Sequence, residues 1–267
     1  ITEEMKLATA KAIAGLVPEE ELNEKSVKED EISYLYEKLE ELKANDKIKD
    51  RIKSEIRRLE SLSMVSPEVS VVRNYIDWLL SLPWEEETID NDNLKEARQI
   101  LDDSHNGLEN VKERIIEYLA VKQMKGNLKS PIICLAGPPG VGKTTLAISI
   151  AKAMNRKFVK MSVGGINDEA EIIGHRRTYL GSAPGRIIQS LKKAKTKNPV
   201  FLIDEIDKMT RDYKGDPASV LLEILDPEQN KYFSDNFIEE EFDLSKVVFI
   251  TTANYVNQIP EALKDRL

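Results

Sequence analysis

The stretch PIICLAGPPGVGKTTLAISIAKAM, residues 131–154, decides the fold of this chain. It opens with a short apolar run, passes through a glycine-rich turn and continues with apolar residues at helical spacing. The turn matches the pattern GxxxxGK[ST] at Gly137, Gly142, Lys143 and Thr144. Glycines let backbone N–H groups approach phosphate oxygens, and the positive end of the following helix faces the same space. The stretch therefore predicts a phosphate-binding loop between a strand and a helix.

The predicted nucleotide site includes the whole loop and the start of the helix. Lys143 would set a point charge against the β- and γ-phosphates, and Thr144 would offer its hydroxyl to Mg²⁺. The expected cofactors are therefore ATP and Mg²⁺. The residues assigned to cofactor binding in this stretch are Gly137, Pro138, Pro139, Gly140, Val141, Gly142, Lys143, Thr144 and Thr145.

Three further apolar runs follow, separated by helical segments: KFVKMSV, PVFLIDE and KVVFITTAN. Short apolar strands that alternate with helices predict a parallel sheet with helices on both faces. Ligands of such sheets bind at the carboxyl ends of the strands. We therefore expect the residues that end these strands to join the phosphate loop.

Three polar side chains end two of these strands. Asp204 is expected to bind the metal, and Glu205, the next residue, to act as the base for a water molecule. The pair favours hydrolysis over phosphoryl transfer. Asn254, at the end of KVVFITTAN, could hydrogen-bond the γ-phosphate or orient the attacking water.

The part of the chain before residue 131 is charged and helical in pattern. Two groups of apolar residues at three-four spacing flank the polar pair at 45–46 and predict two amphipathic helices: Ile32, Leu35, Leu39 and Leu42, then Ile48, Ile52, Ile56, Leu59 and Leu62. They suit either a coiled-coil-like arm or a helix pair packed on its own domain. Next, VVRNYIDWLLSLPWEEE predicts a helix that ends before Pro83 and is anchored by Trp78 and Trp84. A further helix is expected near residues 107–124.

Composition narrows the function classes. The chain has 267 residues, 41% of them apolar, and a formal net charge of -8, which gives no general attraction to nucleic acid. A single cysteine, Cys134, excludes an internal disulfide, and with two histidines it cannot form a standard structural zinc site. We expect a reducing location, the cytoplasm or a mitochondrial matrix. No apolar run approaches the roughly 20 residues that span a bilayer, so no membrane partner is expected. Both ends of the sequence look cut, and we expect a fragment.

The phosphate loop, the strand ending in Asp-Glu and the strand ending in Asn, in this order, resemble the AAA+ ATPases. The resemblance then narrows to the Lon family of ATP-dependent serine proteases. It rests on GPPGVGKT, GGINDEAEIIGHRRTYLGSAPGRI, PVFLIDEIDKM, GDPASVLLEILDPEQN, FSDNFIEEEFDLSKVVFITTAN and IPEALKDRL, and upstream on VVRNYIDWLLSLPW and GLENVKERIIEYLAVK.

The resemblance implies a domain division. Residues 67–267 would form the large AAA+ subdomain, with a helical lead-in at 67–130 and the sheet core at 131–267. Residues 1–66 would be the end of the amino-terminal region. The small helical subdomain and the peptidase domain with its Ser-Lys dyad would follow Leu267, so no protease site is expected in this chain.

The resemblance also implies residue roles and partners. Tyr179 and Leu180 match the aromatic-aliphatic pair that grips substrate in the channel of related unfoldases, and residues 211–215 suggest a second channel loop. Arg266 matches the arginine that acts on the ATP of the next subunit in a hexameric ring. The implied function is an unfoldase that threads unfolded or misfolded proteins to a peptidase chamber.

Two other readings stay open. The chain could be a nucleotide-binding and assembly module with little turnover, since the parts expected after Leu267 are missing. It could also be a DNA-remodelling AAA+ protein, although the net acidity and the TYLG segment disfavour this, and DNA remains a possible partner.

Overall fold

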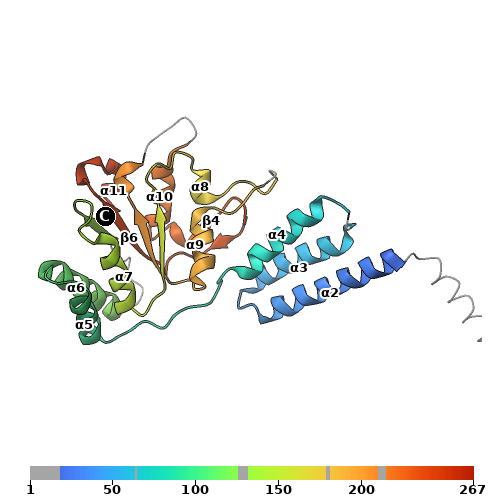
Figure 1. Ribbon diagram of the computed structural model, residues 1–267, viewed down its shortest axis with the longest axis horizontal. Helices are drawn as coiled ribbons and strands as arrows, with labels where there is room; N and C mark the ends of the chain where they lie inside the picture. Colours follow the sequence, from blue (N-terminus) through green and yellow to red (C-terminus); the bar gives the residue numbers. More distant parts are fainter. Residues whose placement is uncertain (1–18, 64, 126–131, 179–180, 210–214) are drawn as a thin grey trace, which may run out of the picture. The chain divides into compact units, whose positions relative to one another are not determined.

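The computed structural model describes residues 19–63, 65–125, 132–178, 181–209 and 215–267. The chain divides into two compact units between Leu80 and Ser81. The first is all-helical and the second is α/β (Figure 1). Among the described residues, no helix is both long and apolar enough to cross a membrane.

The first unit contains α2 (Glu19–Glu41), α3 (Asp46–Ser61) and α4 (Glu68–Ser81). The two amphipathic helices expected on either side of residues 45–46 are confirmed. Asn45 caps α3, because its side chain accepts a hydrogen bond from the Ile48 N–H at 2.9 Å. The predicted apolar spacing defines the core, since Leu35, Leu39, Ile48, Ile52, Ile56 and Leu59 are all buried.

Helix α4 belongs to this helical unit, so the division lies one helix later than the boundary expected at 66/67. The physical reason is its apolar face, which buries Val69, Val72, Tyr75, Ile76 and Leu79. A hydrogen bond of 2.7 Å from Arg73 to Glu31 joins α4 to α2. The helix pair is therefore completed by a third helix.

The expectation that both tryptophans anchor α4 is wrong. Trp84 follows the helix and lies in the second unit, where only 7% of it is exposed. Its ring packs against Phe242 with 5.3 Å between centroids. Trp78 is half-buried on α4. The proline that ends the helix thus separates two aromatic anchors of different units.

The second unit begins with α5 (Leu94–Ser104) and α6 (Glu109–Lys125). The second of these was expected, whereas α5 was not. Asn93 caps α5 by accepting hydrogen bonds from the N–H groups of Lys95 and Glu96 at 3.1 and 3.3 Å. The α5 helix buries only Ala97 and Leu101, which is too sparse an apolar pattern to stand out in the sequence.

All four predicted strands form one parallel sheet. They are β1 (Ile133–Ala136), β2 (Phe158–Ser162), β3 (Val200–Asp204) and β6 (Val248–Ala253), in the order β1-β6-β3-β2. The register pairs Ala136 with Ala253 and Ser162 with Asp204. The carboxyl ends of the four strands therefore meet at one edge of the sheet.

Helices cover both faces of this sheet (Figure 1). On one face, α7 (Lys143–Ala153) packs with α5 and α6 over β1, β3 and β6, in a core that includes Leu101, Ile150 and Ile250. On the other face, α9 (Arg186–Ala194) packs on β2 and buries Ile187, Ile188 and Leu191. The predicted α/β class is confirmed.

Shorter elements complete the second unit. They are α8 (Ala170–Ile173), α10 (Pro217–Leu225), α11 (Glu261–Lys264), the antiparallel pair β4 (Phe233–Ser234) and β5 (Glu241–Phe242), and the single turns η1 (Ile206–Lys208), η2 (Asn230–Tyr232) and η3 (Val256–Gln258).

Candidate functional site

The phosphate loop joins β1 to α7, as its motif predicts. Gly140 and Gly142 have φ of 84° and 89°, the left-handed region in which glycine is unstrained. Gly142 is also the N-cap of α7 and has no side chain with which to cap the helix. The N–H groups of the first turn therefore have no side-chain acceptor from the N-cap, which suits a bound phosphate.

Lys143 lies across this loop and reaches the neighbouring strand. Its ammonium group donates to the carbonyl oxygens of Gly137 and Pro138 at 2.5 and 3.0 Å. It also donates to Oδ1 of Asn254 at 2.9 Å. The structure thus brings together two predicted site residues that stand 111 positions apart.

Asp204 ends β3 between two partners. Lys160 Nζ lies 2.5 Å from its Oδ2, and the Thr252 hydroxyl donates to its Oδ1. Burial raises the pKa of Asp204, but the hydrogen bonds of Lys160 and Thr252 and the charges of Lys160 and Lys143 together lower this pKa below its usual value. The carboxylate is therefore ionised, which suits a metal ligand, and Lys160 supplies a positive charge next to it.

Glu205 has a different setting from its neighbour. Its backbone is left-handed, with φ 64° and ψ 45°, and its N–H donates to the Thr252 hydroxyl at 3.1 Å. Its carboxylate pairs with Lys208 and accepts a weak hydrogen bond from Ser162 at 3.4 Å. A Cβ atom at Gly164 would lie 2.6 Å from Glu205 Oε2. Gly164 thus leaves the space that the Glu205 side chain occupies.

Asp207 is a site residue that sequence reasoning missed. Only 7% of it is exposed, and its Oδ2 accepts hydrogen bonds from the N–H groups of Asn254 and Tyr255 at 3.0 and 3.1 Å. Asp207 therefore ties the segment after β6 to η1. The sequence signal that could have identified Asp207 is the third acidic residue in PVFLIDEID, two positions after Glu205.

His105 was missed as well. It follows α5, and its Nε2 lies 3.1 Å from the Thr145 hydroxyl in the first turn of α7. That hydroxyl also donates to the Gly142 carbonyl at 2.7 Å. The contact brings the segment before α6 to the rim of the phosphate loop.

Comparison with known proteins agrees with this geometry. Residues 133–267 match the family described as AAA, "ATPase family associated with various cellular activities". The chain belongs to the AAA family of ATPases. The match covers the sheet, the phosphate loop and the strand ends that carry the three polar side chains.

The resemblance to Lon proteases is confirmed. The chain is 59% identical to Lon protease 1 of Bacillus subtilis over 249 residues, which is 93% of this chain and 32% of that protein. It is 57% identical to the Lon protease of Ureaplasma parvum over 251 residues, 94% of this chain and 32% of that protein. It is also 57% identical to the Lon protease of Clostridioides difficile over 249 residues, 93% and 32%. The chain spans about one third of the length of these relatives and corresponds to their ATPase region.

In this AAA module, Arg266 pairs with an acidic side chain that is not among the predicted nucleotide-site residues. It follows α11, and its guanidinium pairs with the Asp226 carboxylate at 2.9 Å. Of its side chain, 46% remains exposed. This position leaves a role on another subunit as a prediction from the family resemblance.

The predicted substrate residues Tyr179 and Leu180 lie outside the described residues, as does 211–214 of the second predicted loop. What the structure describes is the base of the first loop. Gly174 and Gly181, which flank the pair, both have left-handed backbones, with φ of 82° and 79°.

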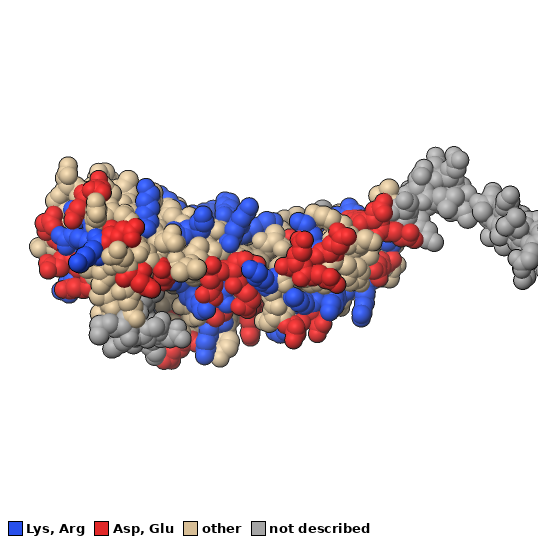
Figure 2. All heavy atoms as spheres, turned by 90° about the horizontal axis from the view of Figure 1, so that it is seen from below, with Lys and Arg blue, Asp and Glu red and all other residues tan. Residues whose placement is uncertain are grey.

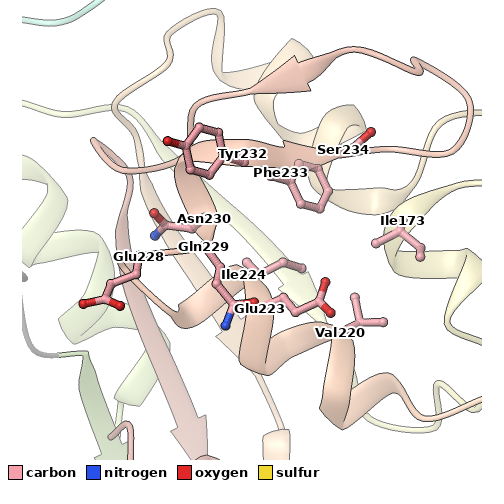
Figure 3. Close-up of a pocket in the computed structure, with 10 residues that line it drawn as sticks. All are labelled: Ile173, Val220, Glu223, Ile224, Glu228, Gln229, Asn230, Tyr232, Phe233 and Ser234. Carbon is pink, nitrogen blue, oxygen red and sulfur yellow. The ribbon is translucent and has the colours of Figure 1, made fainter.

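A cavity of about 410 Å³ lies beside this loop base. Figure 3 shows Phe233 on one side and Ile224 and Val220 on the other, with Ile173 of α8 at one end. Glu223 and Glu228 add acidic groups to the lining. The lining residues do not include any of the phosphate loop, so this cavity is separate from the nucleotide site.

Cys134 is half-buried in β1, and burial raises the pKa of its thiol. The thiol is therefore protonated and unreactive at neutral pH. Among the described residues, no cluster of three or more His, Cys, Asp or Glu side chains forms a metal site. A Mg²⁺ held mainly by nucleotide phosphates needs few protein ligands, and Asp204 and Thr144 stay its predicted ligands.

Proposed function

We propose that this chain hydrolyses ATP with Mg²⁺ and uses the cycle to pull unfolded protein through a ring of identical subunits. The observation that supports the proposal most is the meeting of Lys143 and Asn254 beside the strand end that carries Asp204 and Glu205. Phosphate binding, metal binding and water activation then have separate groups at one edge of the sheet.

Each group has a chemical role in the proposal. The first turn of α7 and Lys143 bind the phosphates, while Thr144 and Asp204 hold the metal. Bound Mg²⁺ would neutralise charge on the β- and γ-phosphates. Glu205 takes a proton from the attacking water, and its exposed fraction of 35% leaves it accessible to that water. Asn254 orients the water or hydrogen-bonds the γ-phosphate.

Lys143 and Lys208 must change partners during the cycle. Lys143 now donates to the loop's own carbonyls and to Asn254, and Lys208 pairs with Glu205. When nucleotide binds, phosphate oxygens would replace these acceptors of Lys143, because a hydrogen bond from an ammonium group to a charged phosphate is stronger than one to a neutral carbonyl. Release of Glu205 from Lys208 would free the carboxylate to act as a base.

The proposal that the substrate is a protein rests on the similarity to the relatives. They are named Lon proteases, and Tyr179, Leu180 and Arg266 match the substrate loop and the trans-acting arginine expected from that family. The substrate would be unfolded or misfolded protein, and the assembly a hexamer. A DNA partner has less support, because basic and acidic residues are intermixed on the face seen in Figure 2.

The test is a pair of lysine variants on the same helix. Lys143→Ala should abolish binding of a fluorescent ATP analogue in the presence of Mg²⁺, whereas Lys152→Ala, at an exposed position of α7, should bind it like the unaltered chain. Equal binding by both variants would contradict the nucleotide site.

A second candidate is a nucleotide-binding assembly module with little turnover. The ion pair between Lys208 and Glu205 favours it, because it occupies the proposed base. Tight ATP binding without hydrolysis at any protein concentration would support this candidate over the first.

A further inference from the structure

Residues 235–239 form a turn between β4 and β5 that contacts the loop of residues 175–184 and the residues that flank this loop. This 235–239 turn is firmly held, since Phe237 and Ile238 are 1% and 0% exposed. The 175–184 loop carries the predicted substrate residues. The contacts between turn and loop therefore bear on how that loop is presented.

Asp235 links the turn to the far end of the loop. It is 1% exposed, and its Oδ2 accepts a hydrogen bond of 2.7 Å from the N–H of Gly185. Its Oδ1 accepts from the N–H groups of Phe237 and Ile238 at 2.8 and 3.1 Å. One carboxylate oxygen thus shapes the turn, while the other holds the loop.

Asn236 links the same turn to the near end of the loop. Its backbone N–H donates to the Ile173 carbonyl at 2.7 Å, and its side-chain amide donates to the Gly174 carbonyl at 3.0 Å. Two adjacent residues therefore bind the two ends of one loop.

The two ends are packed together without spare room. A Cβ atom at Gly185 would lie 2.0 Å from the Ile172 carbonyl oxygen, and one at Gly174 would lie 2.8 Å from both Asp235 Oδ1 and the Gly185 nitrogen. Glycine is required at both positions, because any side chain would force the ends apart.

Further contacts close the loop above this base. The His175 N–H donates to the Ala183 carbonyl at 3.3 Å, and Arg177 lies 3.5 Å from the Glu239 carboxylate of the same turn. The turn therefore contacts Ile173 and Gly174 just before the loop, Arg177 within it and Gly185 just after it.

We propose that Asp235 and Asn236 are positioning residues that clamp the two ends of the 175–184 loop, so that the loop meets substrate protein on a rigid base. The inference rests on the proposed function, which assigns substrate contact to this loop. A loop that pulls a polypeptide needs a base that does not yield, since motion at the base would be lost before it reached the substrate.

Replacing one carboxylate oxygen of Asp235 by an amide nitrogen should break the clamp. In Asp235→Asn, an amide oxygen can still accept from Phe237 and Ile238, but the amide NH₂ then faces the Gly185 N–H, and two donors cannot bond. Asn236→Ala removes the side-chain tie to Gly174. The control is Asp243→Asn, because Asp243 also accepts a backbone N–H, from Ser245 at 2.9 Å, in an exposed turn.

One readout reports on the loop base alone. Hydrogen exchange in peptides that contain Gly185, and trypsin cleavage after Arg176 and Arg177, should each become about tenfold faster in Asp235→Asn. The Asp243→Asn variant should match the unaltered chain in both measurements. No difference between the two variants would overturn the clamp.

The second readout is binding of a fluorescent, permanently unfolded polypeptide in the presence of an ATP analogue, with Tyr179→Ala as the reference for the loop. We expect Asp235→Asn and Asn236→Ala to weaken this binding about tenfold while the affinity for the analogue stays unchanged. If Tyr179→Ala weakens binding and the clamp variants do not, the clamp is overturned and the proposed function stands. If Tyr179→Ala has no effect, the result contradicts the assignment of substrate contact to the loop. It then also overturns the proposed role of the clamp.

Discussion

The buried carboxylate of Asp207 accepts a hydrogen bond from the backbone N–H of Asn254 at 3.0 Å. The same oxygen accepts from Tyr255 at 3.1 Å. Asn254 in turn accepts from Lys143, so Asp207 fixes the backbone of a residue that contacts the phosphate-loop lysine. We therefore expect Asp207, two residues beyond the proposed base, to act as a positioning residue for the site.

Asp207→Ala should therefore affect both stability and turnover. Loss of the acceptor leaves two backbone N–H groups without their partner, which should lower the free energy of unfolding by about 1–3 kcal/mol. The kcat for ATP hydrolysis should fall more than the affinity for ATP. In Asp207→Asn, the amide oxygen can still accept both hydrogen bonds, so its stability should lie close to that of the unaltered chain. Equal effects of the two substitutions in denaturant titrations would contradict this role.

Gly164→Ala should slow hydrolysis without weakening nucleotide binding. The added Cβ would lie 2.6 Å from Glu205 Oε2 and 3.2 Å from Glu205 Cβ, so the Glu205 side chain must move. A general base contributes about 10²–10⁴-fold to a rate, and its displacement should cost at least about tenfold in kcat. Steady-state hydrolysis and ATP-analogue binding measure the two effects. An unchanged kcat would place the base elsewhere.

Arg266→Ala should abolish hydrolysis in an assembled ring while leaving each subunit folded. Its pair with Asp226 is half-exposed at the arginine, so the effect on unfolding should stay near 1 kcal/mol or below. A trans-acting arginine is worth roughly 10³-fold or more in rate. Lys264→Ala, which removes a cation paired with Glu261 in the same helix, is the control.

Mixing variants tests whether Arg266 acts across subunits. Arg266→Ala subunits keep Glu205, and Glu205→Gln subunits keep Arg266, so a mixture of the two inactive variants should regain hydrolysis. A mixture as inactive as its components would argue against a trans-acting Arg266.

The stability contribution of Asp235 should depend on pH. Burial raises its pKa to about 6, although hydrogen bonds from Gly185, Phe237 and Ile238 act in the opposite direction. The unfolded chain has the ordinary value of 3.8. Between these values the folded protein holds a proton that the unfolded chain releases, so the free energy of unfolding falls as pH rises from about 4 to 6.

Asp235→Asn lacks this titration. The difference in free energy of unfolding, variant minus unaltered chain, should therefore rise by up to about 3 kcal/mol between pH 4 and pH 7. Denaturant titrations at several pH values measure it. A difference that is constant over this range would show that Asp235 does not titrate there.

The sequence was sufficient for the sheet and for the ends of its strands. Four apolar runs predict four strands. Because ligands bind at the carboxyl ends of such strands, the sequence also predicts that Lys143, Asp204 and Asn254 lie at one edge of the sheet. These predictions succeeded because a phosphate loop and buried parallel strands leave strong local patterns.

What the sequence could not provide were contacts that depend on strand order. Lys160 meets Asp204 because β2 pairs with β3, and Asp207 meets Asn254 because β6 lies beside β3. No local sequence pattern shows which strands become neighbours in the sheet. Trp84 likewise looks like part of the helix that precedes it, although it packs on Phe242, 158 positions later in the chain.

The most direct test of the proposed function is Mg²⁺-dependent ATP hydrolysis per subunit over a wide range of protein concentration, with Glu205→Gln as the binding-competent control. We expect specific activity that rises with concentration, as subunits complete one another's sites, and that is lost in Glu205→Gln while ATP-analogue binding persists. Hydrolysis that survives in Glu205→Gln would contradict the assigned base, and with it the proposed chemistry of the site.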